Sequence, residues 1–278
     1  MHNFFFWRFL MKRYPIIALL LLVCFLISCK TVPITGREQL AFIPSSTILP
    51  MSFENYNEFI SKHKTIENTP EATMVTRVGK RIQHAVEQYF SSHNLSSKLE
   101  GYQWEFRLVE DKEKNAWCMP GGKVVVYSGI LPMTRDENGL AVVLGHEIAH
   151  AVANHGDERM SQGLLVQMGG VALSTALASK PNETNGLFLA AYGIGSQVGI
   201  LLPYSRLHES EADHLGLIFM AMAGYDPNQA ISFWERMSAS PGQKPPEFLS
   251  SHPADTKRIS NIKKILPEAM KYYKPVTR

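Results

Sequence analysis

Two histidines and a glutamate carry the spacing that metal-dependent hydrolysis requires. The motif HExxH occupies residues 146–150, inside a run of apolar residues with helical periodicity from 140 to 152. Residues four apart share one face of a helix, so His146 and His150 can bind the same zinc ion. Glu147 is rotated from His146 by about 100°, which places its carboxylate beside the ion. We predict one Zn²⁺ per chain, held by the two histidines, with Glu147 as the general base.

A catalytic zinc ion needs a third protein ligand besides these histidines. One subclass of zinc peptidases supplies a histidine six residues after the second one, but Gly156 stands at that position. His155, one residue earlier, would lie about 140° around the helix from His150. We interpret His155 as a packing or surface histidine and expect the third ligand on a later helix.

The segment SRLHESEAD contains two carboxylates that suit this role. Glu209 is followed by Asp213 one helical turn later, and Asp213 is placed to accept the outer N–H group of a ligand histidine. Glu211 is the alternative ligand, because it lies in line with later apolar positions of the same helix. Spacing favours Glu209 without excluding Glu211. We interpret His208 and His214 as bystanders.

The helices that position these residues follow from periodicity and from helix-end signals. The HExxH helix begins near Asp136, whose carboxylate suits a helix N-terminus. A second helix runs from Ser205 to Met222 and is ended by Gly224. Further helical segments are predicted at 51–89, from 226 through 234, and from about 254 to 264.

Two strands are predicted, at 101–110 and 123–127. We interpret the second as an edge strand against which an extended substrate pairs through its backbone. The alternative is a strand of the core. The predicted substrate-binding residues are Lys123, Val124, Val125, Val126 and Tyr127.

Residues 163–203 are apolar and rich in Gly and Ala, apart from a polar stretch at 180–185. Each apolar half is too short to span a bilayer comfortably, so we expect two packed helices. A hairpin that touches a membrane is the alternative.

The N-terminus has the parts of a secretory signal: a basic region at 11–13, an apolar run at 16–27, and a cysteine, Cys29. Twelve residues at about 1.5 Å each cover only about 18 Å, less than a bilayer core of about 30 Å. We predict a signal peptide at 1–28, with Met11 as an alternative start, and a lipid on Cys29.

Charge and cysteine content restrict the class of protein. The chain has 28 Lys and Arg and 25 Asp and Glu, and residues 1–28 contain three of the bases and no acid. The mature chain is therefore neutral, which gives no indication of nucleic-acid binding. If Cys29 is lipidated, Cys118 has no partner for a disulfide. We predict a lipidated tether at 29–50 and a zinc metalloprotease domain at 51–278.

Three segments carry a family resemblance: HEIAHAVANH, the later SRxxExEAD and the upstream NAWCMPGGKVVVYSG. They resemble the HtpX/CaaX-prenyl-endopeptidase family of HExxH zinc metalloproteases. The multiple membrane-spanning helices of HtpX and the prenyl endopeptidases are missing, which favours the lipoprotein branch similar to LoiP and BepA. The resemblance implies an α+β, mainly α-helical fold of the gluzincin-like zincin type, with a small β-sheet and an active-site helix. It also implies that the first glutamate of ExxxD binds the metal, which favours Glu209.

His252 and Arg258 are two further candidates for catalysis. His252 precedes Pro253, so its backbone is biased to an extended conformation just before the last helix. Together with Arg258 it could present two donors to the oxyanion that forms on the scissile carbonyl. The resemblance adds a second role: in BepA-like proteins the matching histidine can occupy the open zinc position and keep the enzyme latent.

These observations predict a zinc endopeptidase that degrades misfolded or damaged cell-envelope proteins. Its substrates would be unfolded or misassembled envelope proteins, and its lipid anchor would hold it at a membrane, with no nucleic-acid partner. We expect a periplasm-facing lipoprotein at the outer membrane. The alternative function is a zinc-stabilised periplasmic chaperone or assembly factor with a latent peptidase site.

Overall fold

The structure is a computed structural model and describes residues 29–167, 178, 180–191, 205–239, 248–249, 252 and 257–275. The predicted signal peptide lies outside the described residues. So does most of the apolar sequence between 168 and 204, on which the question of a membrane-touching hairpin depends.

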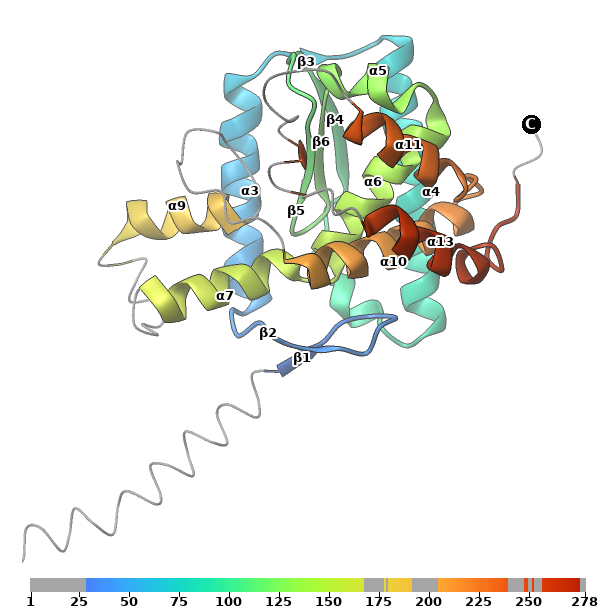
Figure 1. The fold of residues 1–278 in the computed structure, drawn as a ribbon. Coiled ribbons are helices and arrows are strands. Elements are labelled where there is room, and N and C mark those ends of the chain that lie inside the picture. Colours follow the sequence, from blue (N-terminus) through green and yellow to red (C-terminus); the bar gives the residue numbers. More distant parts are fainter. Residues whose placement is uncertain are drawn as a thin grey trace, which may run out of the picture.

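Helices make up most of the described chain, as predicted (Figure 1). The α-helices are α3 (Ser45–Lys62), α4 (Pro70–Ser92), α5 (Leu131–Thr134), α6 (Glu137–Val152), α7 (His155–Gln167), α9 (Pro181–Ala191), α10 (Arg206–Met222), α11 (Gln229–Ser238) and α13 (Arg258–Ala269). The strands are β1 (Cys29–Thr31), β2 (Glu38–Leu40), β3 (Thr65–Ile66), β4 (Glu105–Val109), β5 (Ala116–Met119) and β6 (Lys123–Tyr127).

Four of these strands form a mixed sheet in the order β3-β4-β6-β5. β6 lies inside the sheet, because it pairs in parallel with β4 and antiparallel with β5. The prediction that residues 123–127 form an edge strand is therefore wrong. Gly121 and Gly122 explain the difference. Both have a φ of +81°, which allows a tight turn that places β5 on the outer side of β6.

α6 and α10, which carry the HExxH motif and the SRLHESEAD segment, cross where two glycines meet. A Cβ on Gly145 would lie 2.8 Å from the carbonyl oxygen of Gly216, and one on Gly216 would lie 2.9 Å from the backbone of Gly145. Only residues without a side chain allow this approach. The two glycines thus set the distance between the helices, which lie close together in Figure 1.

The ends of both helices confirm the sequence predictions. Asp136 caps α6 by accepting a hydrogen bond from the Gly139 N–H at 3.0 Å. Ser205 caps α10 by accepting one from the His208 N–H at 3.2 Å. α10 ends just before Gly224, whose φ of +81° is the conformation that commonly stops a helix.

Residues 29–43 belong to the predicted tether at 29–50, and they are part of the folded body in the structure. β1 and β2 pair antiparallel, and we call residues 29–43 the N-terminal hairpin. It lies below α7 and α10 in Figure 1. Val32 and Ile43 are each 1% exposed, and Gln39 Nε2 donates to a backbone carbonyl at the end of α6, at 2.8 Å. The N-terminal hairpin is therefore packed as part of the helical body.

One helix, α3, begins earlier than predicted, and the predicted apolar helices at 163–203 lie only partly within the described residues. α3 begins at Ser45 and includes Pro50, so it overlaps the predicted tether at 29–50. In the apolar region, the described parts of α7 and α9 pack on each other, with Gly163 facing Leu187. Among the described residues, no helix combines the length and apolarity that a bilayer span needs.

Candidate active site

Four side chains converge where α6, α10 and the residues before α13 meet. His146 and His150 come from α6, Glu209 from the first turn of α10, and His252 from the chain before α13. One ligand atom of each lies within 4.8 Å of the others. All four residues are at most 6% exposed. Three imidazoles and one carboxylate in this arrangement can hold one metal ion.

The hydrogen bonds of the two α6 histidines test whether a cation fits. His146 Nδ1 lies 3.0 Å from Asp213 Oδ1, and His150 Nδ1 lies 2.9 Å from His155 Nδ1. With these outer partners, both Nε2 atoms turn their lone pairs into the cluster, 3.0 Å from each other. Facing lone pairs repel each other unless a positive charge lies between them, and zinc prefers these ligand types. The residues therefore fit a zinc ion.

Glu209, rather than Glu211, is the carboxylate of this cluster. Its oxygens lie 3.4 Å from His146 Nε2 and 3.4 Å from His150 Nε2. Burial alone would raise the pKa of the Glu209 carboxyl, but its contacts with His252, Arg258 and His146 hold this pKa well below its ordinary value. An ionised carboxylate in this position suits a bound cation.

Glu147 reaches the cluster from α6. Its Oε1 atom lies 3.4 Å from His252 Nε2. The same atom is buried and has no hydrogen-bond partner within the described part of the chain. Burial raises the pKa of the Glu147 carboxyl. A raised pKa suits a group that accepts and returns a proton near neutral pH.

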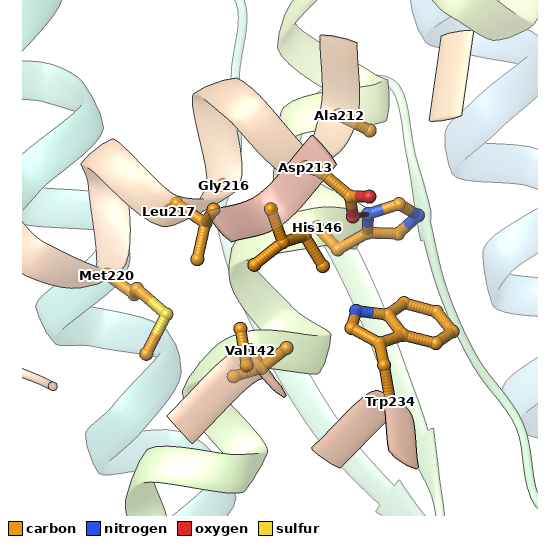
Figure 2. A pocket seen from close by; sticks show the side chains of 10 residues that line it. Val142, His146, Ala212, Asp213, Gly216, Leu217, Met220 and Trp234 are labelled. Atoms are coloured by element: carbon orange, nitrogen blue, oxygen red, sulfur yellow. Dashed lines mark hydrogen bonds and ion pairs between the residues drawn. The ribbon is translucent and has the colours of Figure 1, made fainter. Parts of the chain in front are cut away.

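Asp213 lies beside His146 (Figure 2). Arg258 contacts the same histidine, with 3.2 Å between Arg258 Nη2 and His146 Nδ1. The Arg258 guanidinium donates to Glu209 Oε2 at 2.7 Å, and to Asp213 Oδ2 and Oδ1 at 2.9 and 2.7 Å. Its carbon Cζ lies 3.4 Å from the centre of the Trp234 ring, which packs beside His146 in Figure 2. Asp213 is where the sequence predicts it. The sequence predicts that Arg258 faces an oxyanion. In the structure, its N–H groups donate to the carboxylates of Glu209 and Asp213.

His155 is a site residue that the sequence pattern did not reveal. Periodicity extends the HExxH helix through it, but α6 ends at Val152 and Asn154 adopts a φ of +56°. Asparagine tolerates this left-handed conformation, so the chain turns and α7 begins in a new direction. The turn brings His155, which is 0% exposed, against His150. Asn154 at the helix end was the available signal.

The other acid and histidines of the SRLHESEAD helix lie outside the metal cluster, within the described part of the chain. Glu211 contacts the N-terminal hairpin and α7. His208 Nε2 lies 3.0 Å from Glu158 of α7, and His214 Nε2 lies 2.9 Å from Glu268 of α13. Glu211 is therefore not placed as an alternative ligand in this structure.

Comparison with known proteins places this site in a family. A profile of Peptidase family M48 matches residues 77–266, a range that includes α6 and α10. The chain belongs to Peptidase family M48. Mitochondrial metalloendopeptidase OMA1 of Schizosaccharomyces pombe is 37% identical over 86% of this chain and 66% of its own length. OMA1 of Saccharomyces cerevisiae is 32% identical over 87% of this chain and 70% of its own length.

A bacterial relative matches a shorter part of this M48 chain. The putative beta-barrel assembly-enhancing protease of Vibrio cholerae is 31% identical over 62% of this chain and 35% of its own length. The chain thus spans about two thirds of the two yeast relatives and about a third of the bacterial one. Membership of M48 and the metalloendopeptidase relatives confirm the predictions of a zinc metalloendopeptidase and of a mainly helical zincin-like fold.

The predicted location of this M48 chain, a periplasm-facing lipoprotein at a bacterial outer membrane, is wrong. Its OMA1 relatives in two yeasts, a plant and two mammals are named as mitochondrial enzymes. The signal peptide at residues 1–28 stays a prediction. Cys29 begins β1, and its lipid stays a prediction that mass spectrometry of the N-terminal peptide would test.

Proposed function

We propose that this M48 endopeptidase serves protein quality control by cleaving unfolded or misassembled proteins. The observation that carries the proposal is the placement of the buried metal cluster on α6, against which the edge strand β5 packs. A metal site beside a sheet edge can cleave a chain that is held in extended form. Folded proteins rarely present such a segment, so the arrangement favours unfolded substrates.

The residues of the cluster divide the chemistry between them. His146, His150 and Glu209 would hold the ion. Zinc, when bound, acidifies water and polarises the scissile carbonyl. Glu147 accepts the proton of the attacking water and returns it to the departing amine. Its raised pKa and the lack of a described hydrogen-bond partner for Oε1 support this role.

β5 is the strand that we assign to the substrate, in place of the predicted Lys123–Tyr127. β6 occupies one side of β5, and no described strand pairs with the other side. Two residues before β5, the Lys114 carbonyl accepts a hydrogen bond from the Phe248 N–H at 3.2 Å. Pairing along a strand edge uses backbone groups, so it selects for an extended conformation more than for a sequence.

His252 would keep the resting enzyme latent. Its Nδ1 lies 3.0 Å from Glu209 Oε1 and 3.2 Å from His146 Nε2, so its ring takes the place that a fourth ligand would take. Its Nε2 faces Glu147. A substrate carbonyl and water need this space, which favours a latch over a permanent donor to the oxyanion.

His252→Ala should therefore raise basal cleavage of an unfolded protein by roughly tenfold or more, because a minor open state is typically populated at about 10% or less. The rate is measured with purified protein and saturating zinc. His214→Ala, which removes a histidine that pairs with Glu268, is the control and should leave the rate unchanged. A lower rate in His252→Ala would instead identify His252 as a transition-state donor.

Digestion of a chemically unfolded protein by the purified full chain tests the proposed function. We expect internal cleavage, loss of cleavage when a chelator removes zinc, and recovery when one equivalent of zinc is restored. The same protein in its folded form should resist. Cleavage that persists without metal would contradict the proposal.

A zinc-stabilised chaperone remains the second candidate, because His252 blocks the cluster in this structure. If the protein is a chaperone, both the wild type and the His252→Ala variant should suppress aggregation of an unfolded protein without cleaving it. Cleavage by the His252→Ala variant excludes this function as the sole one.

A further inference from the structure

His146 and His150 obtain their outer hydrogen bonds in different ways. The carboxylate of Asp213 contacts Nδ1 of His146 directly. His150 has another imidazole in this place, with 2.9 Å between its Nδ1 and that of His155. Metal-binding histidines generally need such an outer partner, which fixes the ring orientation and the nitrogen that carries the proton. The question is therefore what fixes His155.

The second nitrogen of His155 answers this question. His155 Nε2 lies 3.2 Å from Glu211 Oε2. Glu211 also accepts hydrogen bonds from Arg37 Nε at 2.7 Å and from Thr35 Oγ1 at 2.6 Å. The Glu211 carboxylate can only accept hydrogen bonds, so His155 donates its Nε2–H to Glu211. His155 Nδ1 is then left with a lone pair. His150 then donates its Nδ1–H to His155, and its own Nε2 lone pair points into the metal cluster.

Arg37 holds this chain of hydrogen bonds from the N-terminal hairpin. Its two terminal nitrogen atoms donate to Glu158 of α7 at 3.1 and 2.8 Å, while Nε donates to Glu211 of α10. The side chain is 20% exposed. A guanidinium can bridge two carboxylates in this fixed geometry, whereas a lysine ammonium acts as a point charge. Arg37 therefore ties α7 and α10 to the N-terminal hairpin at the position of Glu211.

We propose that His155 and Glu211, locked by Arg37, are positioning residues that orient His150 for zinc. The N-terminal hairpin is then a working part of the active site, although it lies more than a hundred residues before the HExxH motif in the sequence. The inference rests on the proposed function, in which His150 holds the ion.

His155→Phe tests the proposal, because phenylalanine fills the space of the ring but cannot accept the His150 Nδ1–H. Zinc affinity, measured by competition with a chelator, should fall by about 10- to 100-fold, the usual cost of losing an outer partner. His155→Asn, which offers an acceptor oxygen near the position of Nδ1, should recover most of the affinity. The absorption spectrum of the cobalt-substituted protein should change in the Phe variant and return in the Asn variant.

His208→Phe is the matched control. His208 is also buried and stacks on the His155 ring, and its Nε2 lies 3.0 Å from Glu158 Oε2. Its zinc affinity should stay within a few-fold of the wild type. Arg37→Lys gives an independent test, because it keeps the positive charge but loses the bridge between Glu158 and Glu211. It should lower zinc affinity, as His155→Phe does.

Two results separate the inference from the function on which it rests. If His150→Ala keeps its zinc, the proposed ligand set is wrong. If His150→Ala loses zinc while a folded His155→Phe protein keeps wild-type zinc affinity and cobalt spectrum, the positioning role is overturned. Should His155→Phe fail to fold, unchanged zinc affinity in Arg37→Lys overturns the locking role in the same way.

Discussion

Glu147→Gln should lower the rate of peptide cleavage by about 10²- to 10⁴-fold, the range that a positioned proton acceptor contributes. Glutamine has nearly the same shape but cannot take a proton from water. Its neutral amide also fits the buried position, where the carboxyl already has a raised pKa. The fold and the zinc content should therefore be preserved.

The measurement pairs cleavage of an unfolded protein with zinc analysis of the same sample. A loss of zinc together with activity would show that Glu147 supports the metal site rather than the proton transfer. Activity within a few-fold of the wild type would remove Glu147 from the mechanism altogether.

Glu209→Gln should weaken zinc binding by more than about 100-fold, since losing an outer partner alone costs about 10- to 100-fold. The substitution removes the only carboxylate of the described metal cluster. It also leaves Arg258, which is 5% exposed, with one carboxylate partner fewer, and an uncompensated buried charge is destabilising. Thermal unfolding of the metal-free variant would measure this second effect separately.

Glu211→Gln is the matched comparison for this prediction. The glutamine oxygen can still accept the His155 Nε2–H, and Arg37 retains its two hydrogen bonds to Glu158. Zinc binding should therefore fall much less than in Glu209→Gln. Chelator competition that gives the opposite order would transfer the ligand role to Glu211.

The two central helices were predictable because their signals are local. Asp136, Ser205 and Gly224 each act within a few residues of a helix end. The HExxH spacing needs nothing beyond the helical repeat to bring His146 and His150 to one face. The sequence alone therefore predicts the two helices and the two histidines at the centre of the candidate site.

The position of β6 in the sheet depends on partners outside the strand itself, and the prediction of an edge strand was wrong. One partner, β4, precedes it by many residues, and the other, β5, is added by the turn at 121–122. A sign was present in the run Val124–Val126, in which each residue is 0% exposed. An edge strand with one solvated face would alternate, whereas an unbroken apolar run indicates a strand covered on both faces.

The outer residues of the site were unpredictable for a related reason. Arg37 and Glu211 are 174 positions apart, and no periodicity connects them. His155 depends on a single change of backbone direction at Asn154. Such contacts appear only once the fold is known.

Arg37 and Arg258, which both neutralise carboxylates near the site, lie far apart in the described chain. Arg37 is among the first described residues to leave the ribosome, and Arg258 is among the last. Glu209 and Asp213 share the Arg258 guanidinium, which is available to them only after residue 258 has been synthesised. A partly made chain therefore holds the HExxH helix but no finished site.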